Sequence, residues 1–171
     1  MTKQELIESF SKNHRELIDY VNSLTDDQFT YSSNGKWTAG QQLSHAYLCL
    51  LPFQRVLASK EFILEKFGKI DRPTWSYDTV LENYLKTSRK APDRYLPEQI
   101  SPEQKAEITE GLQEILPAIQ QVFNEFTDEE LDSLVLPQPL LGNLTIREMF
   151  YLMTYHPIHH LRQTEFNLSD Y

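Results

Sequence analysis

The sequence predicts an all-α protein: a four-helix bundle with one additional short helix between its two helical hairpins. Three observations predict this fold class. Apolar residues recur at three- and four-residue spacing over long segments, glycine occurs only five times in 171 residues, and valine and isoleucine form no alternating runs. A spacing of three and four residues places apolar side chains on one face of a helix, whereas a half-buried strand needs an apolar residue at every second position. We therefore expect no sheet.

Five segments carry the helical pattern, and most of them begin at a residue suited to cap a helix. We expect helices over residues 2–23, 38–67, 76–90, 101–126 and 145–166. The expected caps are Thr2, Thr38, Ser101 and Thr145. A serine or threonine at this position accepts a hydrogen bond from the third helical residue, and a Glu or Gln there returns one. Pro52 is expected to bend or interrupt the second helix, and residues 136–143, with two prolines, are expected to form a loop.

The two halves of the chain repeat one order of features. Residues 24–29 (LTDDQF) and 126–131 (FTDEEL) each follow a long expected helix and precede a connection and a capped helix. We interpret the halves as two helical hairpins of one bundle, with residues 76–90 as the additional helix. The repeat is short, so a chance match is the alternative. A length of 171 residues fits one domain, and we assign residues 1–171 to a single helical bundle domain.

Composition narrows the class of protein and its partners. Apolar residues make up 40% and charged residues 24% of the chain, which is ordinary for a soluble domain with a real core. The net charge of −9 disfavours nucleic acid and anionic membranes, because phosphate groups would repel the protein. Cys49 is the one cysteine, so no intramolecular disulfide forms, and the polar N-terminus has no signal-peptide pattern. We expect a cytoplasmic protein.

Three of the five histidines are candidate metal ligands. His156 and His160 are four residues apart and share one helix face, the spacing at which paired histidines bind zinc in other helices. His45 lies seven residues after Thr38, and the pair lies eleven and fifteen residues after Thr145. At ~100° per residue the three positions fall within roughly 80° of one another, and within about 12 Å along the axis. We predict a divalent metal held by these three residues, with a position left open as in catalytic zinc sites.

Each candidate also has a plainer interpretation. A histidine pair at this spacing arises by chance, and His45 on an apolar stretch is often a hydrogen-bonded core residue. His159 is expected to pack or to face solvent, and His14 to lie at the surface or in a groove. Cys49, four residues after His45, could be a fourth ligand that closes the site. We predict that Cys49 does not ligate, because an ion between it and His45 would be drawn away from the final helix, and because its apolar surroundings keep the thiol protonated.

Two motifs resemble the DinB-like superfamily. Residues 37–45 (WTAGQQLSH) resemble the start of that family's second helix, with an aromatic residue, a cap and a leucine two residues before a histidine. Residues 156–163 (HPIHHLRQ) resemble its closing motif, with two histidines four apart and a glutamine three residues on. The chain departs from the family at Leu161-Arg162, where relatives often carry arginine and then glycine.

The resemblance implies a four-helix bundle that is often a homodimer. It also implies a site in which His45, His156 and His160 bind nickel, zinc or iron. The family includes transferases that depend on a low-molecular-weight thiol, which would be a second cofactor, and many members of unknown activity.

Two functions from different classes follow, besides a purely structural helical protein whose histidines are core groups. The first is a metal-dependent, thiol-dependent transferase or a hydrolase that acts on a small molecule. The alternative is a non-catalytic protein that binds a metal or a small compound in stress resistance. For an enzyme, Gln163 would support a ligand by hydrogen bonding. No carboxylate stands out as a general base, and Glu148 is only a weak candidate. The expected pocket wall comprises Trp37, Trp75, Tyr151 and Tyr155.

Overall fold

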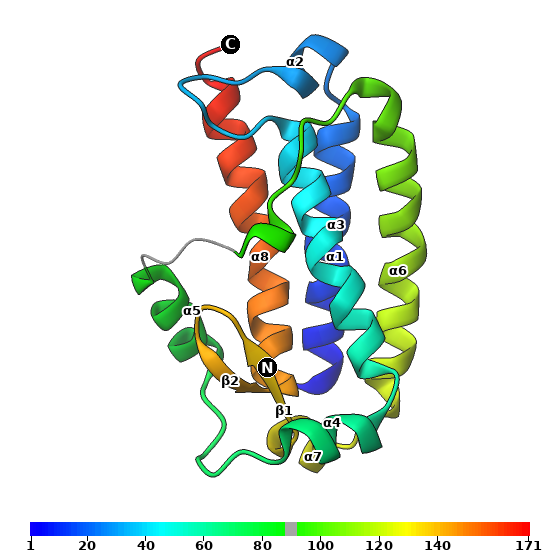
Figure 1. The fold of residues 1–171 in the computed structure, drawn as a ribbon, viewed down its shortest axis with the longest axis vertical. Coiled ribbons are helices and arrows are strands. Elements are labelled where there is room, and N and C mark those ends of the chain that lie inside the picture. The colour runs from blue at the N-terminus through cyan, green and yellow to red at the C-terminus, as the bar shows by residue number, and fades with distance from the viewer. Residues whose placement is uncertain (88–91) are drawn as a thin grey trace.

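The computed structural model of the protein describes residues 1–87 and 92–171 and shows a four-helix bundle (Figure 1). The four bundle helices are α1 (Lys3–Asn22), α3 (Ala39–Leu57), α6 (Lys105–Glu125) and α8 (Ile146–Leu168). The predicted fold class is confirmed. The additional short helix is α5 (Tyr77–Lys86), which packs against α8. The expected continuation of this helix over residues 88–90 lies outside the described residues.

The predicted caps explain where the long helices begin. Thr2, Thr38 and Thr145 each accept a hydrogen bond from the backbone N–H three residues later, and a Glu or Gln side chain at that residue accepts one from the cap's own N–H. Ser101 starts the short 3₁₀ turn η2 (Pro102–Gln104), which leads directly into α6. These reciprocal bonds satisfy backbone donors that the first helical turn leaves unpaired.

The helices of the two halves interleave around the bundle. α1 packs most extensively on α8, and α3 on α6, while α3 also contacts α8 and α1 also contacts α6. In Figure 1, α1 and α8 run away from the end that carries the two strands, and α3 and α6 run toward it. Each half therefore packs mainly on the other half, and α3 and α8 are antiparallel neighbours.

The repeat of the two halves has a structural counterpart. Short helices α2 (Asp26–Thr30) and α7 (Asp128–Ser133) follow α1 and α6, and Thr25 and Thr127 cap them with the same reciprocal bonds. A chance match of six residues would not be expected to produce equivalent helices at equivalent places. The order of long helix, short capped helix, connection and long capped helix thus occurs twice.

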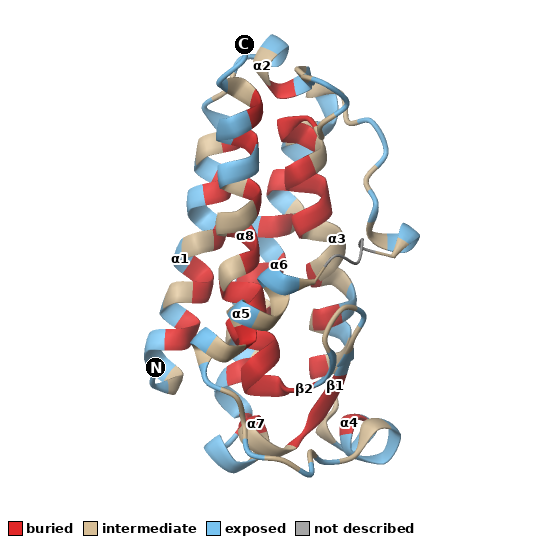
Figure 2. Cartoon of the chain, turned by 90° about the vertical axis from the view of Figure 1, so that its left-hand side faces the viewer, coloured by how far each residue is buried: buried red, intermediate tan, exposed pale blue. Residues whose placement is uncertain are grey.

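One phenylalanine from each bundle helix joins the centre of the core. The Phe150 ring of α8 lies 5.4 Å from Phe10, 5.0 Å from Phe53 and 4.2 Å from Phe123, measured between ring centroids. Figure 2 shows that buried residues follow the inward sides of these helices. Such tilted aromatic contacts add to the free energy of burying the rings.

No helix within the described residues is long and apolar enough to cross a membrane.

The second expected helix is divided, but not at its proline. Pro52 lies inside α3, which continues to Leu57, and α4 (Lys60–Phe67) follows after a break. The break occurs where Ser59 takes an extended conformation and its side chain accepts the N–H of Phe62. A serine that caps a new helix thus ended the segment, whereas the proline was accommodated within α3.

The expected loop at residues 136–143 forms a β-hairpin, so the expectation of no sheet is wrong here. Strand β1 (Val135–Gln138) pairs antiparallel with β2 (Gly142–Thr145). The turn is closed because the side chain of Gln138 accepts the backbone N–H groups of Leu140 and Leu141. Gly142 has a φ of 80°, a conformation that favours glycine. Strands of four residues are too short for an alternating pattern to stand out in a sequence.

Candidate metal centre

Three histidine rings from two helices converge in the interior of the bundle. The Nε2 atom of His156 on α8 lies 3.2 Å from Nε2 of His45 on α3 and 3.0 Å from Nε2 of His160, one turn further along α8. The three side chains are almost fully buried, with 4%, 8% and 4% of the surface of His45, His156 and His160 exposed. The structure therefore brings together the three residues that the sequence singled out.

Hydrogen bonds behind two of the rings orient their Nε2 atoms toward the cluster. The Nδ1–H of His45 donates to the carbonyl oxygen of Tyr95 at 2.6 Å, and the Nδ1–H of His160 donates to Oε1 of Gln42 at 2.5 Å. Because each neutral ring carries one proton, Nε2 of both rings is left as an unprotonated acceptor. This tautomer is the one in which Nε2 binds a metal.

The convergence of these Nε2 atoms fits a bound cation. If Nε2 of His156 carries a proton, it can donate that proton to Nε2 of His45 or to Nε2 of His160, but not to both. At the other contact, two nitrogen lone pairs then face each other with no proton between them. Ligand nitrogens about 2.0–2.1 Å from a tetrahedral metal lie roughly 3.3 Å apart. The separations of 3.2 Å from His156 to His45 and 3.0 Å from His156 to His160 are close to that value. Among the described residues, the group of three whose candidate ligand atoms all lie within 4.8 Å of one another is His45, Cys49 and His156, so His160 joins the cluster through its contact with His156. The donor set therefore suits a divalent ion that accepts nitrogen ligands.

Burial keeps the three rings neutral. It lowers the pKa of His45, although the hydrogen bond to Tyr95 opposes the change, and it lowers the pKa of His156 and His160 well below the usual histidine value. Unfavourable interactions among the neighbouring rings lower the pKa of His156 and His160 further. Only neutral imidazole binds a metal, so the environment favours the ligating form.

Cys49 lies closer to the cluster than the sequence argument assumed. Its Sγ is 3.6 Å from Nε2 of His45, and candidate ligand atoms of His45, Cys49 and His156 all lie within 4.8 Å of one another. An ion near Cys49 could therefore also be reached by His156 on the final helix. The argument that ligation by Cys49 would draw the ion away from the final helix thus fails. The other argument against ligation is supported, because burial raises the pKa of the Cys49 thiol to about 12. That Cys49 does not ligate stays a prediction.

A chain of amide groups connects the buried His160 to the partly exposed His159. Gln42, which accepts the proton of His160, donates from Nε2 to Oε1 of Gln163 at 3.4 Å. Gln163 in turn donates from its Nε2 to Nε2 of His159 at 3.0 Å. Gln163 therefore acts on Gln42 and not directly on a candidate ligand. The sequence pointed to Gln163 but gave no sign of Gln42, whose role depends on contact between α3 and α8.

Two other residues differ from their expected roles. His14 is buried, with 2% of its surface exposed, and donates from Nδ1 to the carbonyl oxygen of Phe10; it continues the apolar face of α1 and does not lie at the surface. Glu148 is fully buried and accepts two hydrogen bonds from Arg72, at 2.6 and 2.9 Å, as well as the N–H groups of Trp75 and Thr145. A carboxylate held by these partners is a structural anion and not a free general base.

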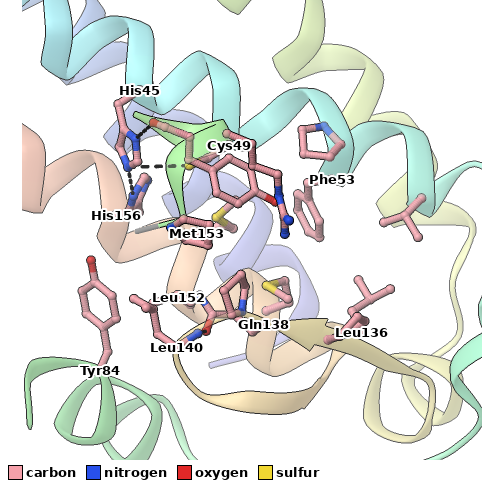
Figure 3. Close-up of a pocket in the computed structure, with 18 of the residues that line it drawn as sticks. His45, Cys49, Phe53, Tyr84, Leu136, Gln138, Leu140, Leu152, Met153 and His156 are labelled. Carbon is pink, nitrogen blue, oxygen red and sulfur yellow. Dashed lines mark hydrogen bonds between the residues drawn. The ribbon is translucent and has the colours of Figure 1, made fainter. Parts of the chain in front are cut away.

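A cavity of about 290 Å³ opens beside the histidines (Figure 3). His45 and His156 lie at one end, and Leu140, Leu152 and Phe53 are among the apolar residues that line the rest. The aromatic residues in this wall are Phe53, Phe67, Tyr84 and Tyr95. The four aromatic residues expected from the sequence are not among them.

Those four aromatic residues have other positions. The Trp37 ring stacks 6.3 Å from His160 and lies 5.0 Å from His45, so it covers the histidine cluster from another side. Tyr151 packs on Tyr77, and Tyr155 on Tyr84. The guanidinium carbon of Arg72 lies over Trp75, 3.7 Å from the centre of the Trp75 ring. Sequence position alone could not separate residues that support the site from residues that line the cavity.

Comparisons with known proteins agree with this arrangement. A family model described as the DinB superfamily matches residues 4–164. A search of curated proteins found no significant match. Among solved structures the chain is similar to YfiT from Bacillus subtilis, which is described as a probable metal-dependent hydrolase with an unusual four-helix bundle topology. The TM-score is 0.65 and the identity 16%, over 95% of this chain and 83% of that chain. At this identity the likeness concerns the fold.

Proposed function

Because the chain belongs to the DinB superfamily, we propose that it binds one divalent metal ion through His45, His156 and His160. We further propose that the loaded protein hydrolyses a small molecule in the adjoining cavity. One observation carries the proposal: Nε2 of His156 lies 3.2 Å from Nε2 of His45 and 3.0 Å from Nε2 of His160, both held as acceptors by hydrogen bonds behind their rings, and His45 and His156 line the end of a cavity.

The number of histidine ligands favours a reactive site over a structural one. Metal sites with three protein ligands keep a position for water or substrate, whereas structural zinc sites are closed by four. When bound, a divalent ion lowers the pKa of a water or thiol and polarises a carbonyl group. Tyr95 and Gln42 would hold the rings of His45 and His160 in the ligating orientation without reorganisation during reaction.

The cavity walls supply the other requirements of such a reaction. Its mainly apolar lining, including Leu152 and Met153, would exclude water and strengthen polar interactions with a bound substrate. Tyr84 lines the same cavity, and burial raises the pKa of its phenol, so the hydroxyl stays protonated and can donate a hydrogen bond to a substrate oxygen. Glu148 takes no part, because its carboxylate is occupied by Arg72.

Hydrolysis is proposed ahead of the other reactions that the sequence left open. The structurally similar YfiT is described as a probable metal-dependent hydrolase, which supports this choice. Transfer of a substrate group to an external thiol would use the same open position. A protein that only binds the metal or a small compound would have the same ligands without turnover.

The test begins with protein purified without chelator. Elemental analysis is expected to find about one zinc, nickel or iron ion per chain. The loaded protein is then assayed on a panel of small esters, amides and lactones, with and without a low-molecular-weight thiol, beside His156→Ala as the control. Turnover that the variant lacks supports the proposal, and dependence on the thiol would assign transfer in place of hydrolysis. A full complement of metal without turnover would favour the binding protein, and absence of metal would overturn the proposal.

A further inference from the structure

The cavity beside the histidines has a charge pattern that restricts what it can bind. We propose that it takes a small apolar molecule with a single anionic group, and that Arg94 binds this group. The inference rests on the proposed function, because it names the class of substrate for the same site. It makes Arg94 a residue that determines specificity.

The apolar part of the inference comes from the lining of the cavity. Most of the described lining residues are aliphatic, aromatic or proline: Pro52, Phe53, Val56, Phe67, Pro92, Leu136, Pro137, Pro139, Leu140, Met149, Leu152 and Met153. A volume of about 290 Å³ is just below the range for small-molecule sites, which is roughly 300–1,000 Å³. A strongly hydrated molecule would lose its water here without replacement hydrogen bonds. A compact aromatic or branched body fits this lining.

The anionic part comes from Arg94, an exposed residue whose side chain is part of the cavity lining. The described lining residues include no Asp or Glu, and Arg94 is the one among them with a permanent charge. The whole chain has a net charge of −9, with 25 acidic residues against 16 Lys and Arg. The charge of the cavity lining is therefore opposite in sign to that of the chain as a whole. No ion pair joins Arg94 to an acidic residue in the described parts of the chain. The guanidinium carbon of Arg94 lies 4.8 Å from the ring centre of Tyr95.

The place of Arg94 in the chain connects it to the histidine cluster. Arg94 and Tyr95 belong to the short 3₁₀ turn η1 (Asp93–Tyr95), and the carbonyl oxygen of Tyr95 accepts the Nδ1–H of His45. Adjacent Cα atoms are ~3.8 Å apart, so one turn positions both the guanidinium and a candidate metal ligand. A guanidinium binds carboxylate or phosphate oxygens in a fixed geometry. The anionic group would therefore orient the reactive bond of a substrate toward the histidine end of the cavity.

Simple hydroxamates test this assignment on the zinc-loaded protein. A hydroxamate group chelates zinc. Affinities for acetohydroxamate, benzohydroxamate and 3- and 4-carboxybenzohydroxamate, measured in one calorimetric series, therefore separate the contributions of the zinc-binding group, the apolar ring and the carboxylate. Benzohydroxamate is expected to bind at least about tenfold tighter than acetohydroxamate, since each buried methylene contributes roughly fourfold. One carboxylated isomer should bind about fivefold tighter again, as for a partly exposed ion pair.

Three variants decide which residues produce these differences. Arg94→Gln should abolish the preference for the carboxylated probe and leave affinity for benzohydroxamate unchanged. Arg15→Gln, which removes the same charge from an exposed position on α1, should change neither. Leu140→Trp places a large side chain in the cavity from the hairpin turn and should reduce affinity for benzohydroxamate but not for acetohydroxamate.

The outcomes distinguish this inference from the proposed function. If zinc and acetohydroxamate bind but the carboxylate adds nothing, or Arg94→Gln keeps the preference, the inference is overturned and the metal site stands. If zinc does not bind, the metal site fails, and 4-nitrobenzoate against nitrobenzene is measured on the metal-free protein. A preference for the anion that depends on Arg94 then supports the inference, and equal binding of the two overturns it.

Discussion

The Nε2 atoms of His45 and His156 lie 3.2 Å apart although the two residues are 111 positions apart in the chain. They belong to neighbouring helices that run in opposite directions, and His160 adds a third nitrogen 3.0 Å from His156. Nitrogen lone pairs that face one another are unfavourable unless a proton or a cation lies between them. This relationship underlies the proposed metal centre and the first three predictions below.

Replacing any one of the three histidines by alanine is expected to remove the metal while the fold is kept. Loss of one ligand of three weakens the site by orders of magnitude, and removal of a buried polar ring from a bundle core is tolerated when the helices keep their other contacts. Metal content by elemental analysis and helicity by circular dichroism are the measurements. His159→Ala is the matched control, because His159 lies beside His160 but bonds to Gln163. Full metal content in all three variants would show that the assignment is wrong.

Cys49→Ser is expected to leave the metal content unchanged. Burial raises the pKa of this thiol to about 12, so ligation would require loss of a proton that the surroundings strongly retain. Serine keeps the size of the side chain and is a poor ligand for zinc. Loss of metal from the variant, or a metal–sulfur distance near ~2.3 Å in an X-ray absorption spectrum, would establish Cys49 as a ligand and close the site.

Gln42→Leu is expected to weaken metal binding by about 10- to 100-fold, the range seen when a hydrogen-bonding partner behind a ligand is lost. Without Oε1 of Gln42, nothing fixes the proton of His160 on Nδ1. Affinity is measured by competition with a chelator of known strength. Gln42→Glu keeps an acceptor at this position and should restore binding. A variant that folds normally but loses no affinity would contradict the role given to Gln42.

Acid is expected to destabilise the metal-free protein in part through His14. Burial lowers the pKa of His14 from 6.5 to about 4 in the folded state. Between these values the unfolded chain binds more protons, so the free energy of unfolding falls as pH falls. From pH 7.5 to 5.0 the contribution of His14 is roughly 2 kcal/mol. Urea unfolding should therefore show a smaller decline for His14→Leu than for the parent protein, and equal declines would contradict the prediction.

Arg72→Met is expected to lower the free energy of unfolding by about 3 kcal/mol, because it leaves the carboxylate of Glu148 buried without its positive partner. The side chain of Glu148 is 0% exposed, and Arg72 makes two of its hydrogen bonds. Urea unfolding at neutral pH measures the loss. The double variant with Glu148→Gln should recover part of the stability. A change below about 0.5 kcal/mol for Arg72→Met would show that this pair does not stabilise the fold.

Local features of the sequence determined the helices and named the candidate ligands. Thr2, Thr38 and Thr145 cap helices as expected because a capping box needs only residues three apart. The spacing of His156 and His160 places both on one helix face for the same reason. Such signals act within one turn of helix, so they can be read without knowledge of the fold.

The hairpin and the division of the second helix were missed because competing local signals were of similar strength. Two prolines suggested a loop at residues 136–143, yet Gln138 and Gly142 close a turn between two short strands. Pro52 suggested a bend, yet Ser59 made the break by capping α4. In both places the packing at the end of the bundle decides between alternatives that differ by about a kcal/mol in local preference.

The tertiary structure alone decided how the site is built. In the sequence, His45 lies seven residues after Thr38 and the histidine pair eleven and fifteen residues after Thr145, and a comparison of these depths treats both helices as if they started at the same end. α3 and α8 are antiparallel, so His45 meets His156 although the two residues are counted from opposite ends of the bundle. Gln42 and Tyr95 bond to the candidate ligands only through contacts between distant segments. The sequence determines the chemistry of each side chain. The partner of each side chain depends on which helix faces pack together, and this packing is a property of the whole bundle.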